Sequence, residues 1–164
     1  SMHAGFIDGG DEAYVEKIYS RIRSLANIAA DNGVILLLET GQESAKDLRH
    51  FLETLNHKSV GVNFDPANMI LYDMDEPIEA LRKLVSHVQQ VHVKDAKRTT
   101  VKGQWGEEVV VGTGQVDWVA FVRILAEADY QGDYIFEREA GDDRVGDIAK
   151  GIVALQAAMQ EVAP

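Results

Sequence analysis

Apolar residues recur along the chain in two patterns, one typical of amphipathic helices and the other of buried strands. In residues 11–32 they recur every three or four positions with charges between them, which predicts an amphipathic helix. The run VILLLET, residues 34–40, is continuously apolar and short, which is typical of a strand covered on both faces. These patterns predict helices over 11–32, 43–56, 76–88, 117–129 and 143–161, and strands over 34–40, 60–65, 88–95 and 133–139.

The boundaries of these elements carry residues that commonly begin or end helices. Asn32-Gly33 ends the first helix, Pro77 stands in the first turn of another, and Asp117 is placed to cap a third. The short apolar opening HAGF, residues 3–6, resembles the tail of one more strand. Regular alternation of helix and strand predicts an α/β fold with a parallel sheet.

Each predicted strand ends with a residue type that binds metals: Glu39, Asp65, His92 and Glu137. The carboxyl ends of parallel strands meet at one edge of a sheet, so these side chains are expected to converge. One such residue taken alone is usually a cap, a solvated charge or a backbone partner, but four in consecutive β–α units favour a site. Three carboxylates and an imidazole suit Mn²⁺ first, with Mg²⁺, Co²⁺ and Zn²⁺ as alternatives.

The segment VHVKD adds two charged residues to this edge. Lys94 lies two positions after His92, so it points to the same face and is expected to reach a substrate oxygen. Asp95 points to the opposite face, where it is expected to orient a neighbour or cap a loop.

Residues 96–116 form a polar, glycine-rich segment that interrupts the regular alternation. One interpretation is a substrate lid in which Trp105 covers the face of a sugar. The other is an ordered surface hairpin without a role in binding. Both interpretations remain open at this stage.

Composition limits the class of protein. The 164 residues suffice for a single domain over 1–164, and a hydrophobic fraction of 46% with a mean hydropathy of -0.16 is that of a globular chain. The absence of cysteine excludes disulfides and thiolate metal sites. A formal charge of -11 opposes binding to nucleic acid. No apolar run approaches the ~18 residues of a membrane span and no signal-peptide pattern opens the chain, so a cytoplasmic location is expected.

In this order, the pieces LLLET, GVNFDPAN, VHVKD, VGTGQVDW and IFEREAG resemble the C-terminal half of the xylose isomerase-like TIM barrels. That superfamily contains sugar phosphate isomerases and epimerases, and the resemblance covers essentially the whole chain. It implies strands five to eight of a (β/α)₈ barrel, with residues 3–6 as the exit of strand four.

The resemblance also implies how the residues act. Glu39, Asp65, His92 and Glu137 would bind one divalent metal, and the two glutamates would move a proton on and off the carbon beside a ketose carbonyl. The implied function is a metal-dependent sugar or sugar-phosphate isomerase or epimerase that works through an enediolate. The alternatives are a related dehydratase, a hydroxypyruvate-type isomerase or a non-catalytic sugar-binding module.

Three features depart from the family pattern. Glu139 lies two residues beyond Glu137 on the same face and is an alternative ligand. Asn68 stands where related epimerases carry a substrate-binding histidine, and is expected to contact substrate. A complete barrel needs about 250 residues. The chain is therefore expected either to belong to a longer protein or to pair with a copy of itself as a homo-oligomer that covers the open barrel edges.

Overall fold

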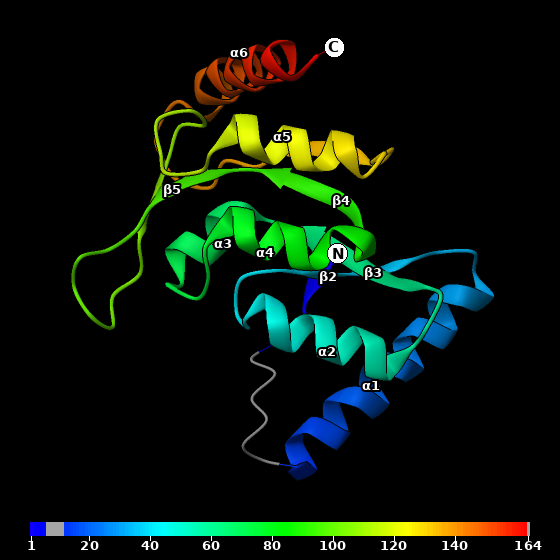
Figure 1. Ribbon diagram of the computed structural model, residues 1–164. Helices are drawn as coiled ribbons and strands as arrows, with labels where there is room; N and C mark the ends of the chain where they lie inside the picture. Colours follow the sequence, from blue (N-terminus) through cyan, green and yellow to red (C-terminus); the bar gives the residue numbers. More distant parts are fainter. Residues whose placement is uncertain (6–11, 164) are drawn as a thin grey trace.

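Helices and strands alternate in the computed structural model, which describes residues 1–5 and 12–163 (Figure 1). The strands are β1 (Met2–His3), β2 (Leu36–Glu39), β3 (Val60–Phe64), β4 (Val88–Val93), β5 (Asp95–Lys97), β6 (Glu107–Val109) and β7 (Asp133–Phe136). The helices are α1 (Glu12–Asp31), α2 (Ala45–Leu55), α3 (Pro66–Leu71), α4 (Pro77–Leu84), the 3₁₀ helix η1 (Val85–His87), α5 (Trp118–Glu127) and α6 (Arg144–Val162).

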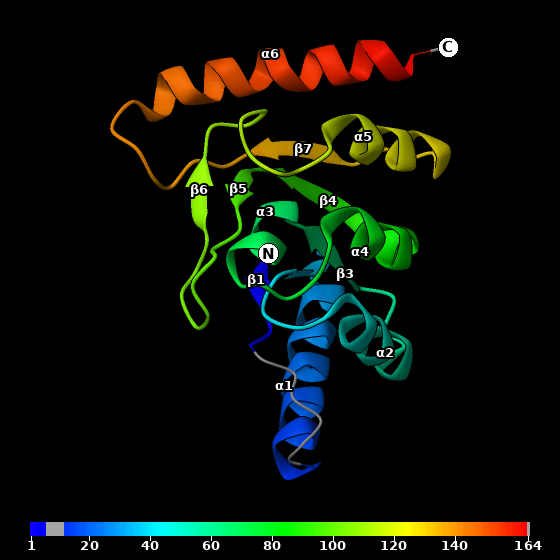
Figure 2. The same ribbon diagram turned by 60° about the vertical axis from the view of Figure 1, so that its left-hand side comes forward.

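Five of the strands form one parallel sheet in the order β1-β2-β3-β4-β7. Helices α2, α4 and α5 lie side by side along this sheet, with α1 at one end of the row and α6 at the other (Figures 1 and 2). The predicted α/β class and parallel sheet are thus confirmed. None of the helices in the described part of the chain is long and apolar enough to cross a membrane.

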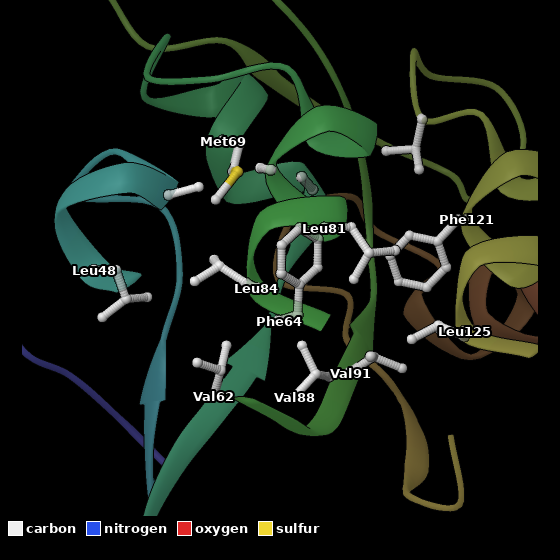
Figure 3. Close-up of a cluster of buried hydrophobic side chains, with 14 of the residues drawn as sticks. Leu48, Val62, Phe64, Met69, Leu81, Leu84, Val88, Val91, Phe121 and Leu125 are labelled. Carbon is white, nitrogen blue, oxygen red and sulfur yellow. The ribbon is translucent and has the colours of Figure 1, made fainter. Parts of the chain in front are cut away.

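The hydrophobic core lies between the sheet and this row of helices (Figure 3). Phe64 of β3 is fully buried, and its ring centroid is 6.0 Å from that of Phe121 of α5. Leu84 of α4 and Val91 of β4 are also fully buried in this cluster. Since alternate residues of a strand face opposite sides, this packing decides which strand residues face the other side of the sheet.

The other side of the sheet, here called the inner face, carries both polar and apolar residues. Asn63 and His92 alternate with the core residues of their strands, and Ile135 of β7 pairs with His92 in register. Ile135 is 40% exposed, and Ile35, just before β2, is 50% exposed. In the described part of the chain, residues 1–5 and 12–163, the inner face therefore exposes apolar side chains to solvent.

A β-bulge in β4 determines how its side chains are divided between the two faces. Val62 of β3 pairs with Val88, but the next residue, Asn63, pairs with Gln90. One extra residue in β4 reverses the alternation of its side chains. Val88 consequently packs in the core while His92, an even number of positions later, lies on the inner face.

The structure adds two elements to those expected. Residues 96–116 contain part of an antiparallel hairpin, because β5 and β6 pair. The short helix α3 was not predicted, since six residues are too few for a periodic pattern, although Asp65 and Pro66 form a typical helix start. Of the predicted strand tail at residues 3–6, His3 lies in β1, while Phe6 is outside the described residues.

Candidate metal centre

Four side chains converge at the carboxyl edge of the sheet, as their positions in the sequence predicted. Glu39 ends β2, Asp65 follows β3, His92 lies near the end of β4, and Glu137 follows β7. One ligand atom from each lies within 4.8 Å of the others. Three of the residues are buried and Glu137 is half-buried.

Asp65 is held so that one of its carboxylate oxygens points into the cluster. Its Oδ1 caps α3 by accepting hydrogen bonds from the backbone N–H groups of Ala67 at 2.8 Å and Asn68 at 3.0 Å. The Thr40 hydroxyl fixes the backbone of Asp65, accepting from its N–H and donating to its carbonyl. The second oxygen, Oδ2, is buried without a hydrogen-bond partner. Burial raises the pKa of Asp65.

His92 faces the three carboxylates with its Nδ1 atom. This nitrogen is 3.5 Å from Glu39 Oε1, 3.6 Å from Asp65 Oδ2 and 3.4 Å from Glu137 Oε2, yet it makes no hydrogen bond of good geometry. Burial lowers the pKa of His92, but the three carboxylates outweigh burial and raise the pKa to about 11. Without a metal, the imidazolium is therefore a counter-charge to the carboxylates.

Lys94 lies on the same face, as expected, and is buried. Its Nζ is 2.9 Å from Glu137 Oε2, 2.6 Å from Glu139 Oε2 and 3.9 Å from Asp65 Oδ2. Burial lowers the pKa of Lys94, but these carboxylates more than compensate and raise it, so the ammonium stays charged. The nearby His92 and then the hydrogen bond from Lys94 hold the pKa of Glu137 down at about 2.

The geometry separates Glu137 from the alternative Glu139. Glu137 belongs to the group of four and is 3.4 Å from His92 Nδ1. The Glu139 side chain is 69% exposed, and it contacts Lys94 instead. Of the two glutamates, Glu137 thus has the better position for a ligand.

Glu39 is supported by two asparagine amides. Asn68 Nδ2 donates to Glu39 Oε1 at 3.2 Å, and Asn63 Nδ2 approaches Glu39 Oε2 at 3.4 Å. Burial raises the pKa of Glu39, whereas the neighbouring His92 lowers it. The pKa of Glu39 lies below its usual value as a result. Asn68 is only 2% exposed, so in this structure it orients Glu39 from within the protein.

Trp105 lies farther out, in the segment between β5 and β6. Its indole packs edge-on against the Tyr72 ring with centroids 5.1 Å apart, and the residue is 74% exposed. Burial raises the pKa of the Tyr72 phenol, while the charge of Lys94 opposes the rise. Trp105 is therefore an exposed residue that packs on Tyr72 and does not belong to the group of four.

The donor set fits a divalent cation. Asp65 Oδ2 and His92 Nδ1 are buried and partnerless, and both point into the space between the four side chains. Native proteins seldom leave such atoms unpaired, which indicates a missing partner. A divalent cation would neutralise the three carboxylates together with Lys94. Oxygen ligands dominate, which suits Mn²⁺ or Mg²⁺.

Reasoning from the sequence missed three residues of this site: Thr40, Asn63 and Tyr72. Asn63 carried a signal, because it is a polar residue inside the otherwise apolar run VGVNF and lies two positions before Asp65. That spacing puts both side chains on the same face of the strand. The contacts of Thr40 and Tyr72 depend on tertiary packing alone.

Comparison with known proteins agrees with this geometry. The family described as "Xylose isomerase-like TIM barrel" matches residues 1–158. A solved xylose isomerase domain protein from Planctomyces limnophilus is 38% identical, with a TM-score of 0.89 over 98% of this chain and 57% of its own. A xylose isomerase-like TIM barrel protein from Mycobacterium smegmatis, solved in complex with magnesium, is 25% identical, with a TM-score of 0.75 over 93% of this chain and 53% of its own.

Among curated proteins, the chain is similar to an inosose dehydratase from Clostridium botulinum. The two are 27% identical over 134 residues, which is 72% of this chain and 45% of the dehydratase. The chain thus spans about half the length of the curated relatives that it matches.

Proposed function

The chain belongs to the xylose isomerase-like TIM barrel family, and from this premise we propose that it carries the metal centre of a sugar or sugar-phosphate isomerase or epimerase. The observation that carries the proposal is the convergence of Glu39, Asp65, His92 and Glu137 around two buried atoms that lack partners. These four residues would hold one divalent cation, Mn²⁺ in the first place. When bound, such a cation supplies electrophilic stabilisation to a carbonyl oxygen.

The protein's own side chains would move the proton. The lowered pKa values of Glu39 and Glu137 keep both carboxylates ionised, which is the state that accepts a proton from the carbon beside a carbonyl. One glutamate would remove the proton and the other would return it. Lys94 would donate a hydrogen bond to a substrate oxygen from its place beside Glu137. Asn68 would keep Glu39 oriented, and the exposed Trp105 would contact substrate.

A dehydratase is the second candidate, and the similarity to inosose dehydratase favours it. Both reactions begin by removing a proton next to a carbonyl, so they use the same residues for the first step. They differ in the second step, because a dehydratase expels a neighbouring hydroxyl group where an epimerase returns the proton. A hydroxypyruvate-type isomerase would share the first step too.

Metal binding tests the proposal directly. After loading with Mn²⁺ and dialysis, elemental analysis should find about one metal per chain in the wild type and little in His92→Ala, which loses a ligand. His50→Ala changes an exposed histidine and should keep the metal. If the wild type retains no metal, the enzymatic proposal fails and a non-catalytic sugar-binding module becomes the better hypothesis.

We further propose that the sheet is one half of a barrel and that a second half covers its inner face. The exposed Ile35 and Ile135 on that face support this proposal. The length of the relatives supports it too, because the chain matches only about half of it. The second half would come from the same polypeptide or from another copy of the chain.

Sedimentation of the chain separates these two sources. A dimer that Ile135→Lys converts to a monomer would identify the second copy as the cover. A monomer that binds a dye for apolar surfaces would leave the face open to another segment. A monomer that binds no such dye would contradict an open inner face.

A further inference from the structure

Asn63 lies in the wall of the metal cluster without belonging to it. It is fully buried on β3 and pairs in register with Glu39 on one side and with Gln90 on the other. Its amide nitrogen is 2.9 Å from His92 Nε2 and 3.4 Å from Glu39 Oε2. Its amide oxygen, Oδ1, is buried and has no hydrogen-bond partner.

The two ring nitrogens of His92 have different surroundings. Nδ1 faces the three carboxylates, and Nε2 faces Asn63. A metal held at Nδ1 needs the lone pair of that nitrogen, so the ring proton must then reside on Nε2. A buried Nε2–H needs an acceptor, and the Asn63 amide is the group within hydrogen-bond distance.

The amide can meet this need by a half-turn about its Cβ–Cγ bond. The turn exchanges Oδ1 with Nδ2, so that the oxygen faces Nε2–H and gains the partner it lacks, while the amide gives up its 3.4 Å contact with Glu39 Oε2. In the orientation of this structure Nδ2 faces Nε2 at 2.9 Å, which leaves an Nε2–H without an acceptor. The turned amide would therefore serve the Nε2–H that stays on the ring when a metal occupies Nδ1.

We propose that Asn63 is a positioning residue whose side-chain oxygen accepts a hydrogen bond from His92 Nε2–H and so presents the Nδ1 lone pair to the metal. This inference rests on the metal site of the proposed function. It assigns to Asn63 a contribution to metal affinity that is separate from its contact with Glu39.

Two variants of nearly equal size distinguish these contacts. Asn63→Asp can accept from Nε2–H but cannot donate to Glu39, whereas Asn63→Leu can do neither. We expect Mn²⁺ affinity, measured by titration calorimetry, to fall about 10- to 100-fold in Asn63→Leu and to stay within about threefold in Asn63→Asp. Thermal unfolding of the metal-free variants shows whether each is folded.

The tautomer of His92 is the second measurement and does not depend on activity. Long-range ¹H–¹⁵N spectra of the Mg²⁺-loaded protein should show the proton on Nε2 in the wild type and in Asn63→Asp. A loaded wild type with the proton on Nδ1 would overturn the proposal, even if Asn63→Leu does not fold. Equal loss of affinity in both variants would also overturn it, since the contact with Glu39 would then be what matters. A wild type that binds no metal refutes the proposed function itself.

Discussion

Replacing Glu137 by glutamine is expected to lower proton exchange at the carbon beside a ketose carbonyl by about 10²- to 10⁴-fold, the contribution typical of a positioned acid or base. The amide has nearly the shape of the carboxylate but cannot accept the proton. It also removes a negative oxygen that lies 3.4 Å from His92 Nδ1, so the affinity for Mn²⁺ should fall at least about tenfold. Exchange is measured by NMR in D₂O across a panel of ketoses and sugar phosphates, and affinity by calorimetry.

Glu139→Gln is the matched control, because both glutamates contact Lys94 and follow the same strand. The Glu139 side chain is exposed and outside the group of four, so this variant should keep its metal and exchange within about threefold, as surface changes usually do. Loss of metal in Glu139→Gln together with retention in Glu137→Gln would reverse the assignment of the ligand.

Replacing Asp95 by alanine is expected to lower the free energy of unfolding by about 3–5 kcal/mol, through several buried donors that lose their acceptor. Asp95 is 1% exposed, and its carboxylate accepts hydrogen bonds from the backbone N–H groups of Ala96, Gly112, Gly114 and Val116 and from Trp118 Nε1. It thereby ties the chain after β6 to the start of α5. For a chain of this size the melting temperature should fall by roughly 10 °C.

Asp117→Ala provides the comparison, since it removes a carboxylate from the same part of the chain. The Asp117 carboxylate accepts a single hydrogen bond, from Ala120 N–H at the start of α5, so its loss should cost about 1 kcal/mol. Denaturant unfolding followed by circular dichroism measures both variants. A loss in Asp95→Ala no larger than that in Asp117→Ala would show that the five contacts contribute little.

The sequence predicted the face of the strand on which Asp95 lies, but not how many hydrogen bonds its carboxylate accepts. Alternation along VHVKD placed Asp95 opposite His92 and Lys94, and the structure confirms that it organises a loop. The identity of its donors depends on how residues 110–118 fold back on β5. Gly114 shows this dependence, because a Cβ there would overlap the Asp95 carboxylate.

The hairpin of β5 and β6 was less predictable than the main sheet. Its strands have three residues each, and their pairing joins residues ten or more positions apart across a polar segment. No periodic apolar pattern marks such short strands. The sequence therefore left a surface hairpin and a substrate lid as equal alternatives, and the pairing of β5 with β6 shows that the segment contains a hairpin.

The sequence by itself determined the alternation of the main helices and strands, the parallel sheet and the edge at which Glu39, Asp65, His92 and Glu137 meet. It did so because apolar periodicity reports local structure, and parallel strands bring their carboxyl ends to one edge. Tertiary structure alone decided which atoms face one another there. The bulge in β4 sets which side chains of that strand face inward, and the cap of α3 leaves Asp65 Oδ2 free. The bulge depends on the register between two strands, and the burial of Oδ2 depends on the segments that pack around it, which no local pattern records.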